Sequence, residues 1–210
     1  MTTSFIYLAK ITHRPVLLWP SKRSTPRYDL QPGAADVHLA MAGHLYSNLD
    51  YNGARAEIER ARETLPNDQL LFELSGYIDR RQGRWQESTR NLERALELDP
   101  NNRYVLQQIS NSYEFLPQYA KEAAVLDRAI ALKPNDRDPR ISRAQLDIYW
   151  TADTRPLHAL IESLIRQDSA VAADLAPMRI FLATAERDPV AGAKALADLR
   201  DKSYGPDAIR

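Results

Sequence analysis

Residues able to carry out acid–base or metal chemistry are few in this sequence, and they are not grouped. The four histidines are His13, His38, His44 and His158. Only His38 and His44 are close along the chain, and a spacing of six residues does not place two side chains on one face of a helix. We therefore expect no histidine metal site and no histidine general base.

Other catalytic chemistries lack their residues too. The sequence contains no cysteine, which excludes disulfides, thiolate metal ligands and cysteine nucleophiles. Its seven glycines form neither of the spacings GxGxxG and GxxxxGK that cradle phosphates, and no serine stands in a GxSxG turn. Acidic pairs such as Glu93 and Glu97 are typical of charged helix faces. The sequence predicts a protein that is not an enzyme and needs no cofactor.

The composition favours a folded chain with no dominant charge. Of 210 residues, 44% are hydrophobic, which suffices for a packed core. Lysine and arginine number 28, as do aspartate and glutamate, so we expect no nucleic-acid partner. No apolar run approaches the roughly 18 residues of a membrane span, and the start only faintly resembles a signal peptide. We expect no membrane insertion and a cytoplasmic location.

The elements that position the side chains are indicated by proline. Four prolines recur at an interval of 34 residues: Pro32, Pro66, Pro100 and Pro134. Counting each unit to the second residue after a proline gives three regular units: 35–68, 69–102 and 103–136. A fourth, weaker unit follows at 137–170. A fixed period of this length is typical of repeats built from pairs of helices.

Equivalent places in these units hold residues of equivalent size. The eighth place is always small: Ala42, Gly76, Ser110 and Ala144. The twenty-seventh is small as well: Ala61, Ala95, Ala129 and Ser163. The twenty-fourth is large and apolar: Ile58, Leu92, Leu126 and Leu160. The seventeenth, where we expect the second helix to begin, is aromatic in the regular units: Tyr51, Trp85 and Tyr119. Helices can approach closely only where a small residue lies at their crossing point.

The segment GRWQESTRNLERALELDPNN, residues 83–102, resembles the tetratricopeptide repeat at nearly every defining place. The resemblance is specific over residues 35–136. It implies an all-α fold, a right-handed superhelix (α-solenoid) of antiparallel helix pairs. In this family the first helix of each pair lines a concave groove that binds partner proteins or peptides.

Outside the three units the pattern weakens. Residues 137–204 are interpreted as degenerate helix pairs or a C-terminal cap, with helices at about 137–150, 156–166, 171–186 and 189–200. Residues 1–31 are interpreted as an irregular N-terminal arm or the remnant of a preceding repeat, since prolines interrupt any helix there.

The resemblance also assigns candidate groove residues: Tyr77, Arg80, Arg81, Tyr104, Gln107, Gln108, Asn111, Glu114 and Tyr149. The same places hold Glu73, Phe115 and Gln145. Aromatic rings offer rigid contact area, arginines offer paired donors to a carboxylate, and amides can pair with an extended backbone. The alternative interpretation is an ordinary solvated helix face. The Lys–Asn–Arg clamp that some relatives use to hold a C-terminal carboxylate is not reproduced.

Taken together, these features predict a protein-interaction scaffold or adaptor that binds a protein or peptide in its groove. The alternative is a sensor or regulatory segment of a larger bacterial signalling protein, of the Ser/Thr kinase or winged-helix regulator type. Homo-oligomerisation through the open ends of the repeat array is a further possibility, because stacked repeats leave apolar end faces.

Overall fold

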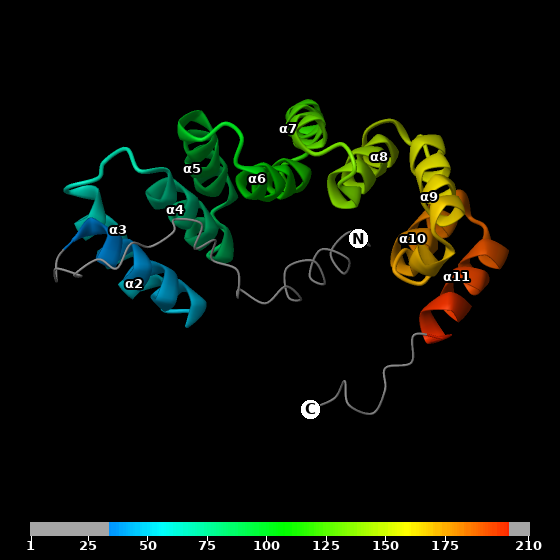
Figure 1. Cartoon of the computed structure of the whole chain (residues 1–210), viewed down its shortest axis with the longest axis horizontal. Coiled ribbons are helices and arrows are strands. Elements are labelled where there is room, and N and C mark those ends of the chain that lie inside the picture. Colours follow the sequence, from blue (N-terminus) through cyan, green and yellow to red (C-terminus); the bar gives the residue numbers. More distant parts are fainter. Residues whose placement is uncertain (1–33, 202–210) are drawn as a thin grey trace. The chain divides into compact units, whose positions relative to one another are not determined.

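The structure is a computed structural model that describes residues 34–201. Figure 1 shows these residues as a succession of helices joined by short turns, with no strand among them. The all-α fold expected from the sequence is thus confirmed. None of the described helices is both long and apolar enough to cross a bilayer. The expected arm at 1–31 lies outside the described residues.

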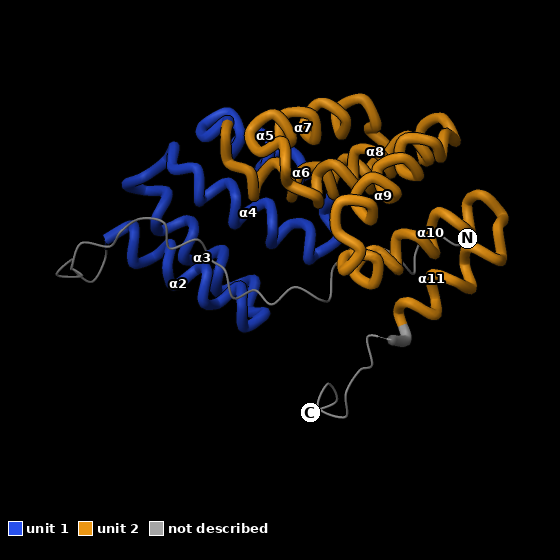
Figure 2. Tube along the Cα trace, turned by 45° about the vertical axis from the view of Figure 1, so that its right-hand side comes forward, with its two compact units in different colours: residues 1–100 blue, residues 101–210 orange. Residues whose placement is uncertain are grey.

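The chain divides into two compact units, coloured separately in Figure 2. The described part of unit 1 contains four helices: α2 (Ala35–Ser47), α3 (Tyr51–Arg62), α4 (Gln69–Arg81) and α5 (Trp85–Leu98). Helices α2 and α3 pack together, as do α4 and α5. Their core is aliphatic, with Ile58, Leu71, Leu74 and Ile78 removed from solvent.

Unit 2 begins after Pro100. Its α-helices are α6 (Arg103–Phe115), α7 (Tyr119–Leu132), α8 (Arg137–Thr151), α9 (Arg155–Gln167), α10 (Ala176–Glu186) and α11 (Pro189–Asp201). A short 3-10 helix, η1 (Ser169–Ala172), precedes α10. Buried aliphatic side chains connect successive helices, for example Leu126 of α7 with Leu146 of α8.

Local sequence signals account for the helix boundaries in the regular repeats. Second helices begin at Tyr51, Trp85 and Tyr119, as the sequence predicted. Two of the first helices are capped by polar side chains. Asp68 accepts a hydrogen bond from the backbone N–H of Leu70 at the start of α4, and Asn102 accepts hydrogen bonds from two backbone N–H groups at the start of α6. Gly83 follows the end of α4 with φ +77°, a left-handed conformation that favours glycine. The prolines Pro66, Pro100 and Pro134 all lie in turns.

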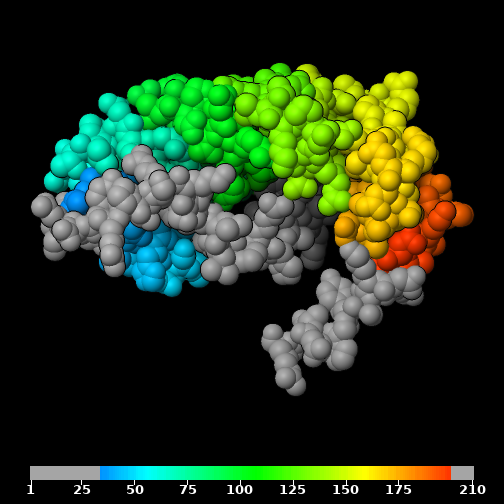
Figure 3. Space-filling model, viewed as in Figure 1, coloured from blue at the N-terminus to red at the C-terminus, as the bar shows by residue number. Residues whose placement is uncertain are grey.

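Small residues lie where paired helices cross. Ala42, Gly76 and Ser110 are buried in α2, α4 and α6, and the second helices bury Ala61, Ala95 and Ala129. A Cβ atom added to Gly76 would come within 2.9 Å of Leu92 Cγ on α5. The space-filling view shows the outer surface of these packed helices, coloured along the sequence (Figure 3). A larger residue at Gly76 therefore cannot fit without movement of α4 or α5.

The weaker C-terminal repeats differ from the sequence interpretation in two ways. The helix expected from residue 171 begins at Ala176 instead, because η1 and a turn occupy the preceding residues. In α9 the buried side chains are Leu157 and Ile161, whereas the expected contact residues Leu160 and Ser163 are only half-buried. Helix α8 is 15 residues long, against 13 for α4 and α6. Because of this extra length, α9 begins later within its repeat than the other second helices, and different residues of α9 face the core.

Candidate partner-binding faces

Helix α6 carries the most accessible row of candidate residues. Its buried side consists mainly of Val105, Leu106, Ile109 and Tyr113. The candidate residues recur on the other side at helical spacing: Tyr104, Gln107, Gln108, Asn111, Glu114 and Phe115. The two aromatic residues at the ends of this row are 46% and 45% exposed, and the amide residues between them are half-buried. We call this row the α6 face.

Tyr149 of α8 is close to the charged end of the α6 face. Burial raises the pKa of its hydroxyl, and the negative charges of Glu114 and Glu122 raise this pKa further. The Tyr149 hydroxyl accepts a hydrogen bond of 2.9 Å from Gln145 Nε2, and its ring lies 5.8 Å from that of Phe181 on α10. Tyr149 is therefore fixed in place and only half-buried, with carboxylates in electrostatic range.

In unit 1, α4 offers less of its predicted face. The Tyr77 hydroxyl donates a hydrogen bond of 2.6 Å to Glu73 Oε1, and the guanidinium of Arg80 lies over its ring. Only 5% of Tyr77 is exposed, so it does not present the accessible aromatic surface expected of it. Glu73 precedes Tyr77 by one helical turn and anchors its hydroxyl on the same side of α4, and the ring of Tyr46 on α2 packs nearby.

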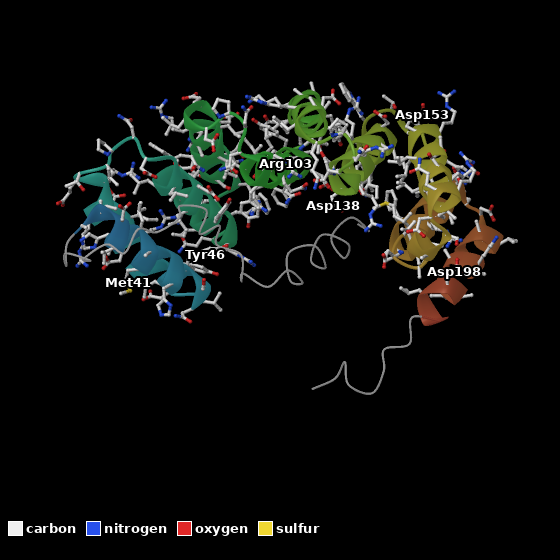
Figure 4. All side chains as sticks on the ribbon, viewed as in Figure 1. Met41, Tyr46, Arg103, Asp138, Asp153 and Asp198 are labelled. Carbon is white, nitrogen blue, oxygen red and sulfur yellow. The ribbon has the colours of Figure 1, made fainter. Side chains whose placement is uncertain are left out.

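Arg81 is exposed, and its Nε lies 3.4 Å from the Tyr46 hydroxyl of α2. The Tyr46 ring, labelled in Figure 4, lies 6.3 Å from that of Tyr77 and 6.0 Å from that of Tyr51. Of the unit 1 candidates, Arg80 and Arg81 thus remain accessible or partly accessible, while the tyrosines form a packed cluster.

Glu73 is the most deeply buried acid of α4, at 1% exposure. Burial raises the pKa of its carboxyl group, and the hydrogen bonds from Tyr77 and Gln69 oppose that shift. No ion pair with Glu73 is found among the described residues. Its contribution to stability is therefore expected to depend on pH.

The described histidines take part in ordinary side-chain contacts. His38 Nδ1 lies 2.6 Å from Glu57 Oε2 and joins α2 to α3, while His158 lies between Glu162 and Glu186. Within residues 34–201 no group of three or more histidine, cysteine or acidic side chains is arranged to hold a metal ion.

Sequence reasoning missed a polar cluster in unit 1. Asp79 of α4 is almost fully buried, and its carboxylate accepts hydrogen bonds from Arg55 of α3, Arg84 before α5 and Asn91 of α5. Arg55 is far from the others in the sequence, and each residue alone resembles an ordinary surface residue. The i, i+5 spacing of Asp79 and Arg84 across the turn at Gly83 was the only local signal.

The comparisons with known proteins agree with this architecture. No protein-family model matches the sequence, and no curated protein matches it. Solved structures do: MamA from Desulfovibrio magneticus has a TM-score of 0.68 and 13% identity over 80% of this chain and 97% of its own. PilF from Pseudomonas aeruginosa has a TM-score of 0.64 and 20% identity, covering 83% of this chain and 79% of its own.

A third solved structure, YrrB, is described as a tetratricopeptide repeat protein with an unusual peptide-binding site. It has a TM-score of 0.62 and 18% identity, and the match covers 80% of this chain and 86% of YrrB. At such low identity these likenesses bear on the fold. Together with the paired helices and the 34-residue period, they show that this chain has a tetratricopeptide repeat fold.

Proposed function

We propose that this protein is a non-enzymatic adaptor that binds an extended segment of a partner protein on the α6 face of unit 2. The observation that carries the proposal is the pair of exposed aromatic rings, Tyr104 and Phe115, on either side of a row of amides. Aromatic residues commonly supply the largest share of binding energy at protein interfaces.

The amides suit an extended backbone. Gln107, Gln108 and Asn111 each carry a carbonyl acceptor and an NH2 donor, and peptide groups of a bound segment need both. Their half-buried position limits the side-chain freedom that is lost on binding. A likeness in fold to YrrB, described as having a peptide-binding site, supports the same kind of ligand.

The three regular units at 35–68, 69–102 and 103–136 supply the binding scaffold, and the helices after residue 136 act as degenerate repeats or a cap. Arg80 and Arg81 of α4 form a second, smaller contact surface in unit 1, with Tyr77 as its support.

The test uses peptides selected on the full chain from a random displayed library. Replacing both aromatics, Tyr104→Ala with Phe115→Ala, should weaken a selected peptide by about thirtyfold or more, the loss expected for an interface hot spot. Leu132→Ala on α7 is the matched control, because Leu132 is also an exposed apolar side chain but belongs to a second helix. The Leu132→Ala variant should bind the selected peptide with wild-type affinity.

Two results would contradict the proposal. One is a control variant that loses as much affinity as the double variant, which would place binding elsewhere. The other is a set of selected peptides that bind the Tyr104→Ala, Phe115→Ala double variant as tightly as the wild type. Far-ultraviolet circular dichroism of each variant shows whether the helical content has been kept.

A further inference from the structure

We infer that the arginine cluster around Asp79 in unit 1 is a binding site for an anionic side chain of a protein partner, separate from the α6 face. The site is an open depression of about 470 Å³, lined by Arg55, Asp79, Arg84, Glu87, Arg90 and Asn91. All six residues belong to α3, α4, α5 or the turn before α5.

Asp79 orients two of the arginines. Its Oδ1 atom accepts hydrogen bonds from Arg55 at 2.5 Å and from the Nε and a terminal nitrogen of Arg84 at 3.0 and 2.8 Å. Asn91 Nδ2 donates to the other carboxylate oxygen at 2.7 Å, and both arginines also donate to Gln82. The guanidinium groups are thus held in place before any ligand arrives, which lowers the entropy cost of binding.

The arginines retain unused donors. A guanidinium carries five N–H groups, and Arg55 and Arg84 use only part of theirs in the hydrogen bonds found among residues 34–201. Among residues 34–201, Arg90 makes one hydrogen bond, 3.1 Å to Glu87, and its side chain is 67% exposed. Three cations face two carboxylates in the depression, so an incoming anion would complete the charge balance.

The repeat fold does not require this cluster. Thirty-four residues further on, the equivalents of Asp79, Arg84 and Asn91 are Tyr113, Gln118 and Val125. In unit 2 these places therefore hold no ionisable acid or base other than a buried tyrosine. A polar network absent from the equivalent place in the same chain is better explained by binding than by folding.

The shape of the site indicates what binds. The depression is wide open, and its lining is largely polar, which suits the end of a side chain on a large partner better than an enclosed small molecule. Arginine donors form paired hydrogen bonds with the planar carboxylate of an acidic residue and with phosphate oxygens. The shared ligand chemistry is therefore an anionic oxygen pair carried by a peptide, from glutamate or from phosphoserine.

The test measures fluorescence anisotropy of three labelled octapeptides with the full chain. They are identical except for two central residues: glutamates, phosphoserines or glutamines. We expect the glutamate or phosphoserine peptide to bind and the glutamine peptide to bind at least tenfold more weakly, as expected when charged hydrogen bonds are lost. The tighter of the two anionic peptides identifies the source of the anion.

Arg90→Gln should weaken the anionic peptide by about tenfold. Arg60→Gln is the matched control, since Arg60 is also an exposed second-helix arginine that pairs with a glutamate three residues earlier. Because neither arginine donates any of the hydrogen bonds found to Asp79 in the described part of the chain, both variants should keep the fold. Arg84→Lys, which retains the charge but loses the fork geometry, should also weaken binding.

Equal effects of Arg90→Gln and Arg60→Gln would overturn the inference, since they would show diffuse charge attraction. Equal affinities for all three peptides would overturn it too. Arginine Nε–Hε nuclear magnetic resonance signals of Arg55 and Arg84 should shift on binding, and unchanged signals would place the peptide elsewhere. Peptides selected for the α6 face should be unaffected by Arg90→Gln, so the two proposals fail independently.

Discussion

The contact between Gly76 and Leu92 makes a sharp prediction about stability. In Gly76→Ala the new Cβ atom would lie 2.9 Å from Leu92 Cγ, 3.1 Å from Leu92 Cδ2 and 3.2 Å from the backbone oxygen of Ser88. The leucine can rotate, but the backbone oxygen cannot move without displacing α5. We therefore expect a net loss of stability, although alanine is normally favoured over glycine inside a helix.

The magnitude follows from two opposing effects. Overpacking a well-packed core costs about 1–3 kcal/mol, and alanine gains about 1 kcal/mol over glycine in helix propensity. Gly76→Ala should thus destabilise the protein by about 1 kcal/mol. In Gly192→Ala on α11 the new Cβ atom would lie at an ordinary distance of 3.7 Å from Ala183 Cβ, so the same substitution should stabilise by about 0.5–1 kcal/mol.

The assay is thermal unfolding followed by circular dichroism. A difference of about 2 kcal/mol between the two variants corresponds to roughly 4–8 °C in Tm for a chain of this size. Adding Leu92→Ala to Gly76→Ala should show favourable coupling, because the clashing atoms have been removed. A Gly76→Ala protein that melts at or above the wild-type temperature would refute this account of how α4 and α5 pack.

Two further predictions concern single side chains. Glu73→Gln keeps an acceptor for Tyr77 but removes a buried charge. Because the folded-state pKa of Glu73 is raised, the wild type should lose stability as the pH rises above about 4.5, so the variant should gain stability relative to it. Urea titrations from about pH 4 to 8 measure this difference, and parallel stability curves for the two proteins would contradict the prediction. Asn102→Ala removes the acceptor for the N–H groups of Tyr104 and Val105 and should lower the free energy of unfolding by about 1 kcal/mol, measured as a lower urea midpoint. Asn102→Asp keeps an acceptor at this position and should leave the midpoint unchanged.

The regular repeats could be predicted from the sequence because their helices obey a single rule. Every unit needs a small residue at the helix crossing and a large one beside it, so residues such as Gly76 and Leu92 recur at a fixed interval. The aromatic residues at the starts of second helices follow the same interval. The starts of the second helices at Tyr51, Trp85 and Tyr119 could therefore be placed from the spacing alone.

The C-terminal helices could not be placed as well, because local helix length is not encoded in the repeat period. Helix α8 continues to Thr151, where Ala152 adopts a left-handed conformation, and the core of the next helix moves to Leu157 and Ile161. The start of α10 depended on η1, a four-residue element with no periodic signal. Sequence spacing detects repetition, and these elements do not repeat.

Accessibility of the candidate site residues was equally hard to predict. Tyr77 and Tyr104 both lie on first helices, yet Tyr77 is buried and contacts Glu73 and Arg80, whereas Tyr104 is 46% exposed. Periodicity predicts the helix face on which a side chain lies, but it does not predict whether neighbouring side chains cover it. The Asp79 cluster escaped prediction for a related reason: its arginines come from α3 and from the start of α5, and charged residues on helices are usually solvated.

The α6 face and the arginine cluster around Asp79 differ in the physical origin of their affinity. The α6 face relies on Tyr104, Phe115 and amides, so binding there should depend on buried apolar area and change little with salt. The Arg55–Arg84–Arg90 cluster relies on charge at a solvent-exposed site, where raising the ionic strength from 0.1 M to 1 M shortens the screening length from about 10 Å to 3 Å. A partner that keeps its affinity at high salt is therefore held mainly by the α6 face, whereas one that loses it is held by the arginines.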